Sequence, residues 1–369
     1  MKLLFVAGTR PNFVKLAPLI HSAKSYSSFE IKICHTGQHF DFNMSDSFWQ
    51  SLDIPTPNFN LHISGQGVSD TIGKSIIGIS DVLKHEQFDG IVVFGDVNAT
   101  VAGAIAGAQS GIKVIHVEAG LRSFDRRMPE EINRVITDHI SDFLFVSEKS
   151  GLLNLSNEGI SNDKIHFVGN IMIESLIKTK EKWEKIKLLN EIENFIEKDF
   201  MLATFHRPEN VDNEMTLKRV CTIINEMANH FRIVLPLHPR TKANLIKFEM
   251  LEYVNGNHNI LVCEPLPYFE FLNLMQKSTC LITDSGGIQE ETSYLGKPCI
   301  TFRNNTERPI TIEEGTNKLL DLFECKFASI ILDHIESVAK RKALEISYWD
   351  GNVSNRILNV LAHDLGINP

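Results

Sequence analysis

The sequence predicts an α/β protein built from two doubly wound parallel sheets. Three observations support this: the chain has 369 residues, short apolar runs alternate with longer amphipathic stretches, and the runs form two series separated by a charged segment. Such alternation is typical of parallel strands joined by helices. A chain of this length exceeds what one hydrophobic core usually supports, so the two series predict two domains of similar size.

The first series starts at the N-terminus, and its apolar runs are LLFVA (3–7), IVVF (91–94), VIHV (114–117) and FLFV (143–146). The opening run resembles a signal peptide, but Gly8 and Arg10 interrupt it at once, so we expect a buried first strand. The second series comprises MLATF (201–205), IVLPL (233–237), ILVC (260–263), CLIT (280–283) and CITF (299–302).

A stretch rich in lysine and glutamate, residues 178–200, lies between the two series. This composition is typical of a solvated connector helix rather than a partner site. We therefore expect an N-terminal domain over 1–172 and a second domain over 173–350. The tail 351–369 predicts an amphipathic helix that packs across the junction. A cleft between the two domains is then available for a ligand.

The composition excludes several classes of protein. A net charge of −9 argues against nucleic-acid binding, which needs a basic surface. No apolar run approaches the roughly 18 residues that a membrane span requires, so we expect a soluble chain with no membrane partner. The six cysteines are scattered without a CxxC pair, which favours free thiols in a reducing cytoplasm.

Ligands of open parallel sheets bind beyond the carboxyl ends of the strands, so the polar residues that follow each run matter most. After the first run, Gly8 permits a tight turn, Arg10 and Lys15 bring positive charge, and a helix begins near Pro11. This pattern is typical of an anion-binding loop. An ordinary turn with two surface cations remains the alternative.

Three carboxylates, Asp96, Glu118 and Glu130, lie at or beyond the ends of first-half strands. Their common placement predicts general acid and base chemistry, although each could instead be a helix cap or a salt-bridge partner. Nearby arginines could pair with these carboxylates; they are Arg122, Arg126, Arg127 and Arg134.

In the second half, His206 and Arg207 follow one strand, and His238 and Arg240 follow the next. A histidine near a phosphate can donate a proton to a leaving group. Lone histidines are commonly structural, which is the alternative for His238 above all.

The string TDSGGIQEE gives the sharpest physical signal of this half. Ser285, Gly286 and Gly287 form a glycine-rich turn that opens a helix, where free backbone N–H groups suit a diphosphate. Glu291, about one turn further on, could accept hydrogen bonds from ribose hydroxyls or could simply cap the helix.

Two further arginines, Arg303 and Arg308, follow the last clear strand and could neutralise a diphosphate. No metal-ligand spacing appears in the sequence. No G-x-G-x-x-G fingerprint follows the first strand, so a nicotinamide has no obvious site. We therefore expect neither a metal nor a cofactor.

Taken together, these strings resemble the non-hydrolysing UDP-N-acetylglucosamine 2-epimerase family over nearly the whole chain. The strings are GTRPN with Lys15, GD at Asp96, HVEAGLRSFDRRMPEEINR, HR at His206, DSGGIQEE, and TERP with the following EEGT. The resemblance implies a GT-B fold of two Rossmann-like domains and a homodimeric isomerase. UDP would be held mainly by the second domain, with the sugar facing the first.

The resemblance also implies a reaction. The C2 proton of the sugar is not acidified by a carbonyl, so UDP is eliminated as that proton leaves, giving 2-acetamidoglucal, and is added back with a proton on the opposite face. The matching acid and base candidates are Asp96, Glu118 and Glu130, with His206 assisting the leaving diphosphate. The matching substrate-binding residues are Arg10, Lys15, Arg207, His238, Phe271, Ser285, Gly286, Gly287, Glu291 and Arg308.

One motif departs from the family pattern. Members that UDP-N-acetylglucosamine activates allosterically carry a Gln-His motif with a further glutamine, and later an Arg-Gln pair. This chain has Gln38 and His39, but Asp41 takes the place of the further glutamine, and Gly65 precedes Gln66 in place of the arginine. The resemblance therefore does not extend to allosteric activation.

Several alternatives stay open. A hydrolysing relative would release UDP and free N-acetylmannosamine, and a 2-epimerase of a modified UDP-acetamido sugar would share the same motifs. A GT-B glycosyltransferase would share the UDP site but needs an acceptor, and the three carboxylates speak against it. A sensor of nucleotide sugars would bind without turnover.

Overall fold

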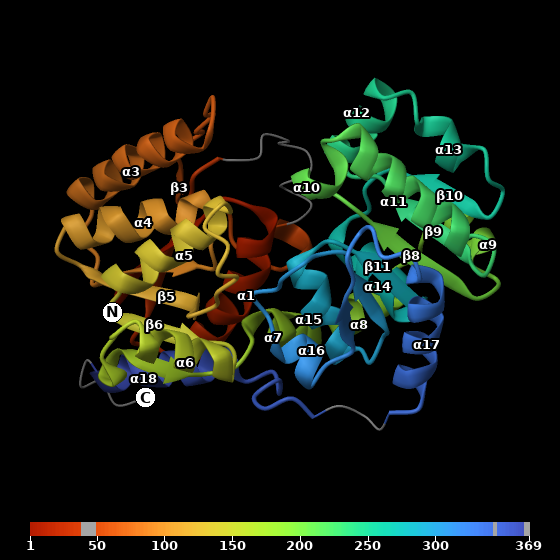
Figure 1. Ribbon diagram of the computed structural model, residues 1–369. Helices are drawn as coiled ribbons and strands as arrows, with labels where there is room; N and C mark the ends of the chain where they lie inside the picture. The colour runs from red at the N-terminus through yellow and green to blue at the C-terminus, as the bar shows by residue number, and fades with distance from the viewer. Residues whose placement is uncertain (38–48, 342–344, 365–369) are drawn as a thin grey trace. The chain divides into compact units, whose positions relative to one another are not determined.

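The computed structural model describes residues 1–37, 49–341 and 345–364 (Figure 1). Gln38, His39 and Asp41 lie outside these residues. The chain divides into two compact units, one of Met1–Lys178 with Ser347–Pro369 and the other of Thr179–Ile346. The boundary expected at residue 172 lies inside helix α7 (Ile171–Lys178).

The first unit contains a parallel sheet of seven strands in the order β3-β2-β1-β4-β5-β6-β7. Both faces of its centre are covered by helices, which explains why every residue of β4 is buried. The strands are β1 Lys2–Ala7, β2 Glu30–His35, β3 Phe59–Asn60, β4 Gly90–Phe94, β5 Lys113–Ala119, β6 Phe143–Val146 and β7 Ile165–Phe167.

Two helical layers cover this sheet (Figure 1). One layer consists of α3 (Val68–His85), α4 (Asn98–Gln109) and α5 (Pro129–Ile140), and the other includes α1 (Arg10–Ala23), α7 and α18 (Val353–Asp364). Glycines in α4 let it approach the sheet closely: a Cβ at Gly107 would lie 2.3 Å from a methyl group of Ile91. Next to β6 and β7 lie α6 (Lys149–Asn157) and the short 3₁₀ helix η1 (Asn162–Lys164).

The C-terminal helix α18 packs against α1 and α7 within the first unit. The buried carboxylate of Glu174 on α7 accepts hydrogen bonds from the backbone N–H and the hydroxyl of Ser354. This contact fixes the start of α18. Its packing across the junction of the two domains stays a prediction.

The second unit contains a parallel sheet of six strands in the order β10-β9-β8-β11-β12-β13. Its strands are β8 Phe200–Thr204, β9 Arg232–Pro236, β10 Ile260–Cys263, β11 Cys280–Thr283, β12 Cys299–Thr301 and β13 Asn317–Leu319. Its helices are α8 Lys180–Lys185, α9 Asn190–Phe195, α10 Pro208–Val211, α11 Glu214–Met227, α12 Pro239–Lys247, α13 Leu251–Asn255, α14 Tyr268–Lys277, α15 Gly286–Tyr294, α16 Ile310–Glu313 and α17 Phe327–Ala339.

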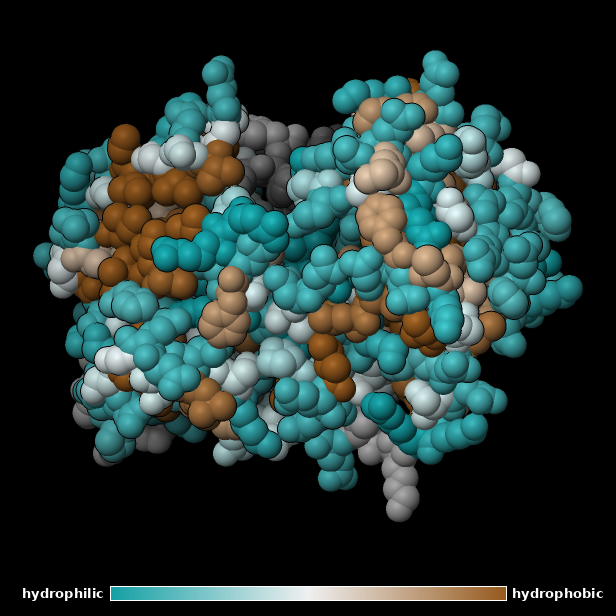
Figure 2. Space-filling model, in the orientation of Figure 1, coloured by the Kyte–Doolittle hydropathy of each residue, from teal (hydrophilic) through white to brown (hydrophobic). Residues whose placement is uncertain are grey.

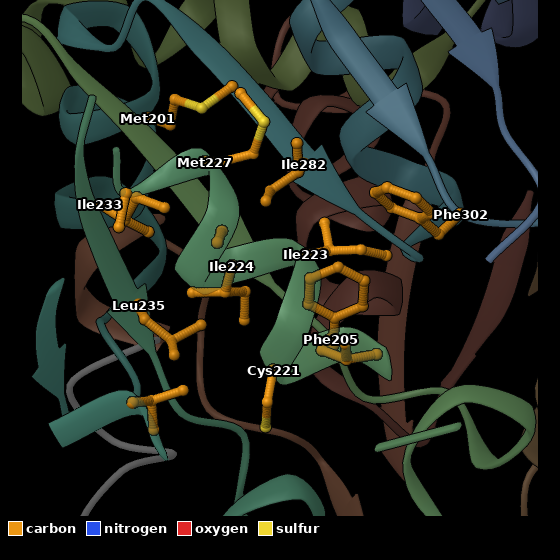
Figure 3. Close-up of a cluster of buried hydrophobic side chains, with 14 of the residues drawn as sticks. Met201, Phe205, Cys221, Ile223, Ile224, Met227, Ile233, Leu235, Ile282 and Phe302 are labelled. Atoms are coloured by element: carbon orange, nitrogen blue, oxygen red, sulfur yellow. The ribbon is translucent and has the colours of Figure 1, made fainter. Parts of the chain in front are cut away.

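The core of this unit lies between the sheet and α11, where Ile223, Ile224 and Met227 meet Ile282 and Phe302 (Figure 3). The charged stretch 178–200 differs from the expected single connector helix. It forms two short helices, α8 and α9, and Trp183 on α8 is buried against α14. No helix among the described residues is long and apolar enough to cross a membrane.

Each sheet reverses its strand order once, between β1 and β4 in the first unit and between β8 and β11 in the second. Loops that leave neighbouring strands at such a point diverge to opposite faces and open a crevice at the carboxyl ends. The strings after β1, β4, β5, β8 and β11 therefore lie at or next to the two switch points, whereas His238 follows β9 and the TERP string follows β12.

Candidate active site

The switch point of the first unit carries a group of side chains called here the carboxylate site: Lys15, Asp96, Glu118 and Arg134. Glu118 lies in β5 with a φ of 72°, a left-handed conformation that a residue with a side chain rarely adopts. The pairing of β5 with β6 shifts register at this residue, so Glu118 forms a bulge in the sheet. Strained backbone of this kind is typical of functional sites.

The carboxylate of Glu118 forms an ion pair with Lys15 from α1, and both side chains are buried. A buried charge requires a partner of this kind. Gly95 makes room for the pair, because a Cβ at this position would lie 2.7 Å from Lys15 Nζ. Gly95 also has a φ of 64°, and it directly precedes Asp96. Lys15 and Glu118 therefore lie beside the turn that carries Asp96.

Two residues of α5 hold Asp96 in position by hydrogen bonds. Arg134 Nη2 donates to Asp96 Oδ2 at 2.5 Å, and Asn133 Nδ2 donates to the Asp96 carbonyl at 2.9 Å. Of the four arginines expected near the carboxylates, Arg134 thus makes the pairing, and its Nη1 also contacts Glu131 Oε2 at 2.7 Å. Each of the two carboxylates at the switch point is therefore held by a cation.

The neighbours Glu130 and Glu131 lie in different surroundings. Glu130 is exposed in the first turn of α5, as Arg10 is at the start of α1. Glu131 is buried and accepts backbone hydrogen bonds from Ser123 and Phe124, both at 2.9 Å, which fixes the loop before α5. Glu131 is not marked in the sequence, because two adjacent glutamates give no signal of which one is buried.

The switch point of the second unit carries a second group, called here the cation site: His206, Arg207, Arg308 and the N-terminus of α15. Asp284 organises part of it by accepting from the backbone N–H groups of His206 at 3.1 Å and Arg207 at 3.0 Å, and from Asn210 Nδ2 at 3.1 Å. Burial raises the pKa of Asp284, but these donors and the His206 ring outweigh it, so the pKa lies below its usual value. Asp284 was missed, although TDSGG places it directly after β11.

The ring of His206 contacts Asp284 through Nδ1, with 3.1 Å between Nδ1 and Oδ1, and its side chain is 36% exposed. A carboxylate at Nδ1 favours the tautomer with the proton there and leaves Nε2 for a ligand. The ring centroid of His238 lies 5.4 Å away. His238 also caps α12, since its Nδ1 accepts from the backbone N–H of Arg240 at 3.2 Å.

Helix α15 begins at Gly286, with Ser285 as its N-cap residue, as the glycine-rich string predicts. A Cβ added at Gly287 would meet no other atom within 4 Å. A ligand can therefore approach the backbone there. A Cβ at Gly286 would lie 2.8 Å from Arg308 Nη1, which brings that guanidinium to the helix N-terminus. An N-terminus with an arginine beside it attracts anions.

Two buried carboxylates hold Arg308: Glu290, whose Oε2 lies 3.0 Å from Arg308 Nε, and Glu307. Glu307 also pairs with Arg303 at 2.8 Å. Burial lowers the pKa of Arg303 despite this pairing. In this unit, therefore, carboxylates position the cations.

Glu291 lies within the same helix and is buried. Tyr268 of α14 donates its hydroxyl to Glu291 Oε1 at 2.9 Å. Burial raises the pKa of Glu291 to about 7, with Tyr268 opposing the rise and Glu290 adding to it. Phe271, half-buried, lies one turn beyond Tyr268 on α14. An aromatic ring and a polar carboxyl group on neighbouring helices are suited to a nucleoside.

The two sites offer complementary chemistry. The carboxylate site can remove and return protons, and the cation site can hold a diphosphate and protonate an oxygen. The described part of the chain contains no group of three or more histidine, cysteine, aspartate or glutamate side chains arranged to hold a metal ion.

Comparison with known proteins identifies relatives over nearly the whole chain. The family model described as UDP-N-acetylglucosamine 2-epimerase matches residues 21–362. A UDP-N-acetylglucosamine 2-epimerase homolog of Methanococcus maripaludis is 41% identical over 98% of this chain and 99% of its own length. A UDP-2,3-diacetamido-2,3-dideoxy-D-glucuronate 2-epimerase of Pseudomonas aeruginosa is 38% identical over 87% of this chain and 88% of its own.

Among solved structures, the UDP-GlcNAc 2-epimerase of Methanocaldococcus jannaschii, in complex with UDP-GlcNAc and UDP, is similar with a TM-score of 0.90. It is 39% identical, and the match covers 98% of this chain and all of that one. The predicted GT-B fold is confirmed by the two parallel sheets and by this likeness. On sequence and structure alike, the chain belongs to the UDP-N-acetylglucosamine 2-epimerase family.

Proposed function

We propose that this protein is an isomerase that interconverts UDP-N-acetylglucosamine and UDP-N-acetylmannosamine without a cofactor, by elimination and re-addition of UDP. The observation that carries the proposal is the division of charge between the two switch points. Carboxylates held by cations occupy one, and cations held by carboxylates occupy the other. Elimination needs both, a base for C2–H and an electrophilic site for the departing diphosphate.

In the first step a carboxylate of the carboxylate site takes the C2 proton. The electron pair of the C2–H bond forms the C1–C2 double bond, and the C1–O bond breaks with its electrons leaving on UDP. In the second step UDP adds back to C1, while a proton is delivered to the opposite face of C2. Proton transfer on two faces requires two groups, and Asp96, Glu118 and Glu130 supply the candidates.

The cation site stabilises the leaving group. Arg207, Arg308 and the backbone N–H groups at the start of α15 neutralise the diphosphate, and Arg10 adds a cation from the first unit. The imidazolium form of His206, with Asp284 at Nδ1, donates its Nε2 proton to the departing oxygen and takes that proton back when UDP returns. The uridine contacts Phe271 and Glu291. The protein keeps UDP and the glucal bound together, so water does not react with the glucal before UDP returns.

A modified UDP-acetamido sugar is the second candidate substrate. The support is the 38% identity to the Pseudomonas aeruginosa enzyme, whose name specifies a diacetamido glucuronate. The residues assigned above bind UDP and act at C1 and C2, positions that both sugars share. Other side chains would contact the substituents at C3 and C6 and so distinguish the two sugars.

We further propose that the chain acts as a homodimer in the cytoplasm. The support for the dimer is an apolar surface over α3, α4 and α5, shown in brown at the upper left of Figure 2. Its exposed members include Val68, Ile77, Ile132 and Ile136. The support for the compartment is the free state of all the cysteines, one of which, Cys325, is exposed.

The experiment is proton NMR of the protein with UDP-N-acetylglucosamine in deuterium oxide, without added metal or cofactor. The proposal predicts deuterium at C2 and a growing signal from UDP-N-acetylmannosamine. Free N-acetylmannosamine with UDP would instead identify hydrolysis. Unchanged substrate, together with exchange of the diacetamido glucuronate nucleotide, would identify the second candidate, and no exchange of either would refute the proposal.

A further inference from the structure

His116 is a fully buried histidine of β5, two residues before Glu118, that the mechanism above does not use. Both of its ring nitrogens have partners. Nδ1 lies 2.7 Å from Asp138 Oδ1, and Nε2 lies 2.8 Å from the carbonyl oxygen of Gly95. A carbonyl oxygen only accepts hydrogen bonds, so Nε2 must carry a proton.

The other partner, Asp138, is an ionised carboxylate. Besides the ring, it accepts from the backbone N–H of Gly120 at 3.1 Å and pairs with Arg122 Nη1 at 2.7 Å. Nδ1 must therefore also carry a proton, since it faces an acceptor.

Charge balance leads to the same result. Arg122 bridges Asp138 to Glu158, with 2.7 Å between Arg122 Nη2 and Glu158 Oε2. Glu158 is 26% exposed and lies 3.9 Å from His139 Nδ1, so its charge is partly stabilised by solvent, and a charged His116 compensates the buried Asp138. A doubly protonated His116 makes the cluster neutral, as buried ionic groups require.

This cluster makes hydrogen bonds to the backbone beside the carboxylates Asp96 and Glu118. His116 holds the carbonyl of Gly95, the residue before Asp96, and Asp138 holds the N–H of Gly120, two residues after Glu118. Asp138 belongs to α5, which also carries Arg134. We propose that His116 carries a proton on both ring nitrogens and, as an imidazolium, positions the Gly95–Asp96 turn and the Glu118 bulge for proton transfer at C2, an inference that rests on the proposed function.

The first test observes the ring nitrogens of His116 by nitrogen-15 NMR of the full chain from pH 6 to pH 9. The inference predicts that both nitrogens carry a proton in the folded protein. His166, on strand β7 of the same sheet, is the internal reference, because burial lowers its pKa and its ring should be neutral at the upper end of this range. An unprotonated nitrogen on His116 would overturn the inference, whatever the activity of the protein.

The second test measures kinetics of His116→Gln, whose amide can donate to only one of the two acceptors. A shift of the Gly95–Asp96 turn by a fraction of an ångström should lower kcat for C2 exchange by about 100-fold and leave KM within about twofold. The matched control, His166→Gln, should keep the kcat of the unsubstituted protein. Equal kcat for both variants would contradict the positioning role.

The two failures are distinguishable. Absence of exchange in the unsubstituted protein would refute the proposed function, whereas the nitrogen-15 result decides the charge of His116 independently. If His116→Gln does not fold, Asp138→Asn gives the kinetic test, because it keeps the shape of the side chain but weakens its hold on the imidazolium. The same loss in kcat is then expected, and an unchanged kcat would overturn the inference.

Discussion

The two units share a doubly wound parallel sheet but use charge in opposite ways. In the first unit, lysine and arginine hold the carboxylates Glu118 and Asp96. In the second unit, carboxylates hold the cations, as Asp284 does with His206 and Glu290 does with Arg308. The switch point of a sheet thus fixes where a site forms, and the side chains after its strands decide whether it transfers protons or binds anions.

The largest expected effect is at the centre of the carboxylate site. Glu118→Gln keeps the size of the side chain but removes its ability to accept or deliver the C2 proton, so C2 exchange in deuterium oxide should fall by on the order of 10³-fold. UDP affinity, measured by calorimetry, should stay within about threefold. An exchange rate within tenfold of the unsubstituted protein would remove Glu118 from the mechanism.

The next largest effect compares a cation of the second unit with a cation of the first by their influence on UDP binding. Arg308→Met removes a cation from the site in the second unit, so UDP should bind roughly 10- to 100-fold more weakly, since hydrogen bonds to charged groups are the strong ones. Lys15→Met removes the cation that faces Glu118, so kcat should fall while UDP affinity stays within about threefold. If Lys15→Met weakened UDP binding as much as Arg308→Met does, Lys15 would contact the diphosphate. The proposed division of roles, with proton transfer in the first unit and UDP binding in the second, would then be wrong.

Glu291 differs from Asp284 and Glu290 of the second unit, because it accepts a hydrogen bond from the Tyr268 hydroxyl and, among the residues that the structure describes, does not pair with a cation. Its folded pKa of about 7 exceeds the ordinary value of 4.5, so its contribution to stability is complete below pH 4.5 and is lost as pH rises through 7. Relative to Glu291→Gln, the free energy of unfolding should decline by on the order of 3 kcal/mol across this window.

Denaturant titrations of both proteins between pH 4 and pH 8 measure this difference. Tyr268→Phe removes the hydroxyl that opposes the rise in the pKa of Glu291, so the decline should extend to higher pH in that variant. A constant difference between the unsubstituted protein and Glu291→Gln would mean that Glu291 is ionised in the folded state.

The smallest effect on activity is expected on the outer helices of the first unit. Ile77 on α3 is 64% exposed within the apolar surface, so Ile77→Lys should shift the mass measured by light scattering from dimer to monomer. The rate per site should change by no more than about twofold. Ile246→Lys on α12, a similarly exposed isoleucine of the second unit, is the control and should leave the mass unchanged. A monomeric unsubstituted protein would contradict the dimer.

The apolar runs predicted four of the seven strands of the first sheet and five of the six strands of the second, and they missed β2, β3, β7 and β13. The apolar runs before Gly95, Glu118 and Asp284 became β4, β5 and β11, and α15 begins at Gly286 as its glycine-rich string indicates. These features are local, since hydrophobic period and turn chemistry operate over a few residues.

The organising contacts could not be predicted in the same way. Asp284 and Glu131 act by accepting hydrogen bonds from residues that the fold brings near. Asp284 directly follows β11, but the sequence does not show which donors it meets, and nothing in the sequence distinguishes Glu131 from Glu130. The charged connector was expected as one solvated helix, but Trp183 is buried and the stretch breaks into α8 and α9. Here packing of one aromatic residue overrides the pattern of charges.

The most direct test of the central claim follows the oxygen that joins C1 to the diphosphate. UDP-N-acetylglucosamine labelled with heavy oxygen at this bridging position is incubated with the protein, and the position of the label is read by phosphorus-31 NMR. If UDP departs and its β-phosphate turns before UDP returns, the label scrambles into the non-bridging oxygens of the β-phosphate as C2 takes up deuterium. A label that stays bridging, together with no UDP or glucal found after acid quenching of the working protein, would show that the C1–O bond never breaks, and the account would be wrong.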